Sequence, residues 1–356
     1  MNAPNMLKLT ALMSLAGLMM GNTNCGGSAA APQSRVLRRL VEVGKIDAQP
    51  IPLPDGQVFD LQFVINQQYP DVLVATQQYA VINRDITGGL IGGGNSSGPG
   101  LTPKDAGVLH KIGVLAEKWY ATKDAECLIS LPQYKLNGVV NSYEWVSGGG
   151  LRVGYTPTGS NAISNVSGSV HFDKAEMDLT LRAKNPIDGT ISRVANVTKS
   201  QIKTKVAFDI SFGQISIGPE FYYQKGLAKV TKEALELGLS ALRAQTDLQP
   251  WQTRAGEVQD NFITIVGGDD INLKAGDQVS LQNARYQWQS ADKVCDPTAY
   301  VGYVPGQIVA YGVVTNVGDH LSAVQIDKNT QLDDIVPGAL VHLVKLVDAV
   351  PAPVKK

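Results

Sequence analysis

An alternation of apolar and polar residues over positions 199–212 (KSQIKTKVAFDISF) constrains the fold of this chain more than any other segment. Successive side chains of a β-strand point to opposite faces, so a period of two predicts a strand with two different faces. The Gly213-Gln214 pair favours a tight turn and predicts a hairpin over residues 199–222. A similar alternation predicts another hairpin over residues 143–173. The apolar face of the first strand includes Val206, Phe208, Ile210 and Phe212, and the polar face carries Lys203, Lys205 and Asp209.

Two different media fit an apolar strand face of this kind. The eleven residues Ile202–Phe212 match the ~9–11 tilted residues with which a strand crosses hydrocarbon. Membrane strands have to close into a barrel, because open edges leave backbone groups without hydrogen-bond partners. Two hairpins are too few to close alone, so several copies of the chain would contribute strands. The alternative is a pair of hairpins packed on a water-soluble core, which produces the same alternation.

The first 24 residues are typical of an export signal. The apolar run Leu9–Met20 is preceded by a lysine and is shorter than the ~20 residues of a membrane-spanning helix. Cys25 follows, where a lipoprotein signal peptidase would leave an N-terminal cysteine for acylation. We therefore expect lipidation at Cys25 and a tether over residues 25–35. The alternative is cleavage near residues 28–31 without a lipid.

The chain has three cysteines, and their use depends on the compartment. If Cys25 carries a lipid, Cys127 and Cys295 remain as a possible disulfide pair. The oxidising periplasm would permit this bond. Two separate buried thiols are the alternative, because a free cysteine behaves as a small core residue.

The mature chain divides into two parts of different character. Residues 36–248 mix short apolar runs with expected helices near 103–120 and 223–245, which is an α/β pattern. Residues 249–350 contain short β-type runs separated by Gly-Asp and Pro-Gly turns, and residues 351–356 form a tail. The sequence therefore predicts an α+β fold. It consists of an α/β domain with two β-hairpins able to join an oligomeric β-barrel, plus a small barrel-like all-β domain.

No pattern in the sequence indicates an enzyme. The four histidines are scattered, and the glycine-rich segment 88–100 lacks the Gly-Lys-Ser/Thr of a phosphate-binding loop. Asp269-Asp270 does not match calcium-loop spacing, which favours a solvated turn at that point. A formal net charge of -1 argues against a nucleic-acid partner. We expect no catalytic residues, no metal site and no cofactor.

Several segments between residues 134 and 243 resemble a known family. Tyr134–Glu144 (YKLNGVVNSYE) has the form of a strand ending in Tyr-Glu, and Met177–Arg182 (MDLTLR) precedes the turn Asn185–Gly189 (NPIDG). Ala195–Ser200 (ANVTKS) then leads into the alternating strand, and a helix follows. In order and spacing these segments resemble the CsgG family, the lipoproteins that form curli-secretion channels. The resemblance covers about a third of the chain.

This resemblance implies an assembly and a location. Members of the CsgG family are lipidated on the mature N-terminal cysteine and form rings in the outer membrane. Each copy donates two hairpins to one shared β-barrel above a periplasmic α/β ring. The resemblance thus implies a non-enzymatic secretion channel with copies of itself and secreted protein cargo as partners. Lumen-facing residues would be Lys203, Lys205 and Asp209, and residues facing lipid or a partner would be Val206, Phe208, Ile210 and Phe212.

Two further features complete the comparison with known families. Channels of the CsgG family are constricted by a periplasmic loop with aromatic and amide residues, for which Phe63–Tyr69 (FVINQQY) contains candidates. In the C-terminal part, Val258–Leu281, two expected strands around GGDDINLKAGD, resembles the C-terminal domain of FlgT, a component of the flagellar H-ring. The second resemblance implies an alternative function, a structural component of a periplasmic flagellar motor ring. Its partners would be flagellar ring proteins.

Overall fold

The protein is a mixed α+β chain, as the sequence predicts, and strands make up most of its regular structure. The computed structural model describes residues 35–52, 58–82, 101–114, 131–146, 152–156, 159–161, 168–197, 204–212, 227–289, 299–327 and 335–347. These residues belong to one compact unit, Arg35–Lys356. The expected signal peptide lies outside the described residues.

A large mixed sheet is built from the first part of the chain. Its strands are β1 (Arg39–Asp47), β4 (Tyr79–Ile82), β5 (Tyr134–Val146), β6 (Arg152–Thr156), β7 (Gly159–Asn161), β8 (Gly168–Lys184), β9 (Ile191–Val197) and β10 (Thr204–Phe212). The main strand order is β10-β8-β5-β1-β4. β1 is parallel to β4 and β5, whereas β8 is antiparallel to β5, β9 and β10.

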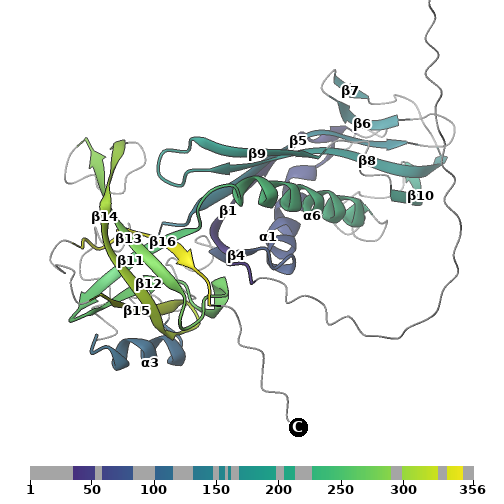
Figure 1. Ribbon diagram of the computed structural model, residues 1–356. Coiled ribbons are helices and arrows are strands. Elements are labelled where there is room, and N and C mark those ends of the chain that lie inside the picture. Colours follow the sequence, from purple (N-terminus) through teal and green to yellow (C-terminus); the bar gives the residue numbers. More distant parts are fainter. Residues whose placement is uncertain are drawn as a thin grey trace, which may run out of the picture. The chain divides into compact units, whose positions relative to one another are not determined.

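Two helices, α1 (Leu61–Ala75) and α6 (Leu227–Thr246), cover one face of this sheet (Figure 1). α1 lies against β1 and β4, and α6 lies against β8 and β9, so that helices and strands share one hydrophobic core. Burial of each large aliphatic side chain contributes about 1.5–3 kcal/mol, which makes this core the main stabilising feature of the sheet. Its fully buried members include Leu61, Ile65, Leu136, Leu179, Leu181, Val230, Leu235 and Leu239.

Helix α1 corrects one expectation from the sequence. Phe63–Tyr69, which contained candidates for a constriction loop, lies inside this helix. The helix begins at Asp60, whose Oδ1 accepts a 2.9 Å hydrogen bond from the backbone N–H of Phe63. Tyr69 is fully buried, and its hydroxyl donates to the carbonyl of Leu136 at 3.3 Å. These candidate residues therefore do not form a loop, because the apolar residues among them recur at helical spacing and pack on the sheet.

The C-terminal part is a closed six-stranded barrel in which every strand pair is antiparallel. Around the barrel the order is β11-β12-β15-β14-β13-β16. The sequence had predicted short strands separated by turns in this part of the chain. The strands are β11 (Gln252–Gln259), β12 (Phe262–Val266), β13 (Gln278–Trp288), β14 (Tyr300–Val317), β15 (Leu321–Ile326) and β16 (Leu340–Lys345).

Two short elements complete the described structure. The strands β2 (Ile51–Pro52) and β3 (Val58–Phe59) form a separate antiparallel pair. Asp269–Ile271 forms the 3-10 turn η2, in which the Asp270 carboxylate accepts hydrogen bonds from the N–H groups of Gly268 and Ile271. The carboxylate of Asp270 therefore stabilises this turn.

Helix α3 (Pro103–Lys111) packs on β14 and β15 of the barrel, although it precedes them far along the chain. Its residues Val108 and Leu109 belong to the same hydrophobic core as the barrel interior. At its first turn, Asp105 is fully buried and its Oδ1 accepts hydrogen bonds from His320 N at 2.9 Å and Leu321 N at 3.1 Å. The barrel core thus includes a helix from the other half of the chain.

A buried arginine, Arg39, fixes the segment that joins α6 to the barrel. Arg39 is 3% exposed and donates to the carbonyls of Gln249 at 2.6 Å and Pro250 at 3.2 Å. Its Nε also donates to the Asp247 carboxylate at 3.2 Å. The backbone N–H and C=O groups of a buried connection need partners, and the guanidinium of Arg39 supplies them for the carbonyls.

Candidate functional site: the strand extension of the large sheet

The two longest strands of the large sheet change neighbours part-way along their length. β5 (13 residues) pairs with β1 up to Val139 and then with β6 from Tyr143 onward. β8 (17 residues) pairs with β9 over its second half and with β10 from Gly168 to Ala175. The result is a second set of strands in the order β7-β6-β5-β8-β10, all antiparallel. We call this set, with the ends of β5 and β8 that belong to it, the strand extension (Figure 1).

Both edges of the strand extension are open within the described part of the chain. β7 pairs with β6 alone, and β10 pairs with β8 alone, among the residues that the structure describes. An edge strand of this kind presents a row of backbone N–H and C=O groups that can pair with another strand. The strand extension therefore has two edges that a strand of another chain could continue, and β4 and β9 elsewhere in the sheet are likewise paired on one side only among the described residues.

The register of β10 against β8 matches positions of like polarity. Phe208 lies opposite Phe172 and Ile210 opposite Val170, whereas Asp209 lies opposite His171. Residues directly opposite one another belong to the same face of an antiparallel pair. The two-faced pattern of β10 is thus repeated on its neighbour.

A register shift limits this pattern at its start. The sequence had placed Val206 and Phe208 on one strand face, and the structure has a bulge or irregularity between Lys205 and Phe208. A bulge inserts an extra residue and breaks the period of two. The uninterrupted alternation of β10 therefore begins at Phe208.

The predicted site residues fall into two groups with respect to the described structure. β10 contains the backbone positions of Lys205, Val206, Phe208, Asp209, Ile210 and Phe212, whose side chains are not among those described. Lys203, the lipidation site Cys25, and both members of the possible disulfide, Cys127 and Cys295, lie outside the described residues. The return strand expected after the Gly213-Gln214 turn lies outside them as well.

An aromatic cluster lies where the strand extension meets the helix-covered core. Tyr143 and Trp145 are fully buried, and their ring centroids are 6.1 Å apart in an edge-on arrangement. The Trp145 ring also lies 6.1 Å from the ring of Phe59 on β3. Burial raises the pKa of Tyr143 to about 12. A neutral, fully packed cluster of this kind gives the strand extension a rigid base.

The opposite face of the same strands is polar and hydrogen-bonded. Ser142 Oγ donates to the Asp178 carboxylate at 2.8 Å. Glu144 lies directly opposite Glu176, and the two are only 1% and 6% exposed. Further along, Asn141 Nδ2 donates to Thr180 Oγ1 at 2.8 Å, and the Thr180 hydroxyl donates to Asn196 Oδ1 on β9 at 2.8 Å.

Sequence reasoning did not identify these buried carboxylates, although a signal for them was present. Ser142 and Glu144 alternate with Tyr143 and Trp145, which is the same two-faced pattern that predicted β10. Both Glu144 and Glu176 interact with neighbouring groups.

A single glycine permits the closest approach within the strand extension. Gly154 on β6 has φ +151°, and a Cβ at this position would lie 1.9 Å from the carbonyl oxygen of Tyr143. Any side chain here would push β6 away from β5. The close approach of β6 to β5 at this point therefore requires glycine.

A metal site and a membrane-spanning helix are two further features to consider in the described residues. Among these residues, no group of three or more His, Cys, Asp or Glu side chains is placed to hold a metal ion. None of the described helices combines the length and the apolar character that crossing a membrane requires.

Comparison with known proteins identifies no family for this chain. No protein-family model matches it, and no curated protein matches it. Among solved structures, a neuraminyllactose-binding hemagglutinin homologue from Helicobacter pylori has 12% sequence identity to it. That alignment covers 60% of this chain and 89% of the other, with a TM-score of 0.24. A superposition this weak carries no argument about fold or function.

Proposed function

We propose that the chain is a non-enzymatic, ring-forming lipoprotein on the periplasmic face of the outer membrane, where it forms a secretion channel similar to those of the CsgG family. In this proposal the strand extensions of neighbouring copies pair edge to edge and close a shared β-barrel. The lipid on Cys25 anchors each copy, and secreted protein is the cargo.

The observation that carries the proposal is the strand extension itself. It is antiparallel, two-faced in register, and open at β7 and β10 within the described residues. β10 has nine described residues, a length that matches the ~9–11 residues of a tilted membrane strand. Edge-to-edge pairing with another copy would supply the partners that the backbone groups of both edges need.

The proposal assigns the two faces of β10 to different surroundings. Phe208, Ile210 and Phe212 would face lipid or a partner subunit, and Asp209 would face the lumen of the channel. Lys205 is left out of the lumen-facing group, because the bulge places it opposite Lys174, on the same face as the Phe208–Phe172 pair. The like-with-like register of Phe208 with Phe172, and of Asp209 with His171, supports this division.

Conductance of the purified oligomer in planar bilayers tests the proposal directly. A channel gives discrete conductance steps. Phe208→Asp should abolish them, because a charge on the lipid face of a membrane strand is destabilising at mid-depth. Ser211→Asp is the matched control, because Ser211 lies opposite Ser169 in the polar register and should tolerate the charge.

Other outcomes of this experiment count against the channel. Equal conductance of the Phe208→Asp and Ser211→Asp variants would refute the assignment of faces. Rings that never conduct, with or without substitutions, would favour the alternative function, a structural component of a periplasmic flagellar motor ring.

Lipidation is tested separately by Cys25→Ser. The variant should leave the membrane fraction if lipid anchors the chain before the ring assembles. Unchanged fractionation of this variant, together with an unacylated N-terminal peptide in the mass spectrum of the wild type, would remove the lipid from the proposal.

A further inference from the structure

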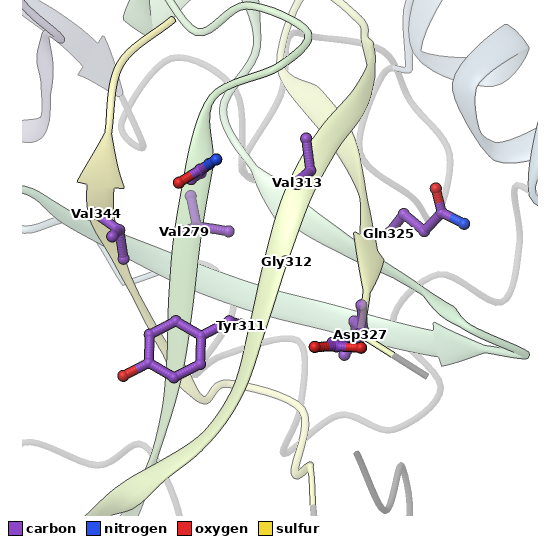
Figure 2. A pocket seen from close by; sticks show the side chains of 9 residues that line it. Val279, Tyr311, Gly312, Val313, Gln325, Asp327 and Val344 are labelled. Carbon is purple, nitrogen blue, oxygen red and sulfur yellow. The ribbon is translucent and has the colours of Figure 1, made fainter. Parts of the chain in front are cut away.

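A hollow of about 380 Å³ lies on the barrel surface, where β16, β13, β14 and β15 run side by side (Figure 2). Three apolar side chains in it are strongly exposed: Tyr311 at 56%, Val344 at 53% and Val313 at 40%. Exposed apolar groups gathered in a concave patch are typical of a binding surface.

Polar groups border these apolar side chains. Gln278 and Gln325 contribute amides to the lining, and Asp327 contributes a carboxylate. Figure 2 shows Tyr311 and Val344 toward one side of the hollow and Gln325 and Asp327 toward the other. The hollow thus offers an aromatic ring and an apolar floor next to one negative charge.

We propose that residues 348–356 of the same chain (DAVPAPVKK) bind in this hollow. Their starting point favours this occupant. Val344, three residues before the end of the described chain, lines the hollow. The N–H of Val347 donates to Asp277 Oδ1 at 3.0 Å, and Asp277 directly precedes the lining residue Gln278. The segment therefore starts at the rim.

The composition of residues 348–356 matches the lining. Pro351 and Pro353 favour the extended polyproline conformation, which exposes backbone carbonyls and fits aromatic-lined grooves at low entropic cost. Val350 and Val354 are apolar, as are the side chains on the floor of the hollow. The Lys355-Lys356 pair is opposite in sign to Asp327.

Because residues 348–356 are covalently attached next to the hollow, weak contacts are sufficient to hold them in it. A polyproline helix rises ~3.1 Å per residue. Residues 348–356 are therefore long enough to reverse direction at the rim and to extend across the few strands that line the hollow. A short linker gives its attached segment an effective concentration on the order of millimolar. This proposal does not depend on the secretion function, because it concerns the barrel alone.

Hydroxyl-radical footprinting with mass spectrometry tests the proposal on the full mature chain. Deletion of residues 348–356 should raise the oxidation rate of Tyr311 at least threefold. Ile308, which is 50% exposed on the same strand and outside the hollow, is the internal control and should not change. Replacement of Val350 and Val354 by Asp in the full chain should reproduce the effect of the deletion.

The remaining outcomes overturn the proposal. An unchanged Tyr311 rate after the deletion would show that another molecule, or water, occupies the hollow. A protection of Tyr311 that disappears on dilution would show that the segment comes from a second copy. Equal changes at Tyr311 and Ile308 would indicate a general loosening of β14.

Discussion

The packing of helix α3 on the barrel is the contact whose contribution to stability can be tested most directly. Asp105→Ala removes a fully buried carboxylate that accepts hydrogen bonds from the N–H groups of His320 and Leu321 and closes the capping box with Thr102. A buried donor left without an acceptor costs about 1–3 kcal/mol, and loss of a helix cap costs about 1 kcal/mol. We therefore expect α3 to be destabilised on the barrel by about 3 kcal/mol.

Hydrogen exchange of the α3 amides measures this effect without requiring the whole protein to unfold. About 3 kcal/mol corresponds to roughly a hundredfold loss of protection, since every ~1.4 kcal/mol is a factor of ten. Asp269→Ala is the matched control at the same junction. It removes the ion pair between Lys104 and Asp269, which are 46% and 60% exposed, and exposed pairs contribute little. If both variants exchanged alike, the buried carboxylate would not be what holds α3.

Three further predictions concern other parts of the fold. Trp145→Ala should destabilise the large sheet by about 3–5 kcal/mol in urea unfolding, because it empties a fully buried site at the base of the strand extension; a change below about 1 kcal/mol would contradict this packing. The hydrogen bond with Asp270 raises the pKa of His320, although burial opposes this shift. The pair therefore makes its full contribution to the free energy of unfolding below the ordinary histidine pKa of 6.5. This contribution should disappear as the pH rises through the raised pKa, and a stability difference between wild type and His320→Ala that does not shrink from pH 5.5 to 8 would refute this. Arg35→Ala leaves the fully buried Asp277 carboxylate without its guanidinium partner and should lower the urea midpoint, whereas an unchanged midpoint would show that the pair is dispensable.

The structure shows which local signals in the sequence were sufficient. The period of two over residues 202–212 predicted a strand that the structure contains as β10, and the apolar stripes of residues 223–245 predicted α6. Short β-type runs after residue 249 predicted strands such as β12 and β15, which the structure confirms. The first two signals are periodic along the sequence, whereas the runs of β12 and β15 are short β-type segments bounded by turn residues.

In helix α1, residues that favour strands and turns obscure a helical spacing of apolar residues. Residues 61–75 contain β-branched residues and Pro70, which favour short strands and turns. The buried side chains nevertheless recur at helical spacing, at Leu61, Ile65, Tyr69, Val72 and Leu73. Packing on the sheet decides between the two patterns, and that contact is not visible locally.

Long-range contacts left no local trace at all. The hydrogen bond from the N–H of Leu321 to Asp105 spans 216 positions of sequence, and the salt bridge of Arg35 to Asp277 spans 242. The change of neighbours along β5 and β8, which creates the strand extension, likewise depends on pairing between distant segments. The local sequence can indicate that a strand is long, but it does not indicate which strands pair with it.

Native mass determination of the detergent-extracted protein, combined with electron microscopy of the same particles, tests most directly whether neighbouring chains complete the open sheet. Our account predicts closed rings of many copies with a central opening, in which the β10 edge of one copy meets the β7 edge of the next. A particle with the mass of one chain, stable at working concentrations, would contradict it.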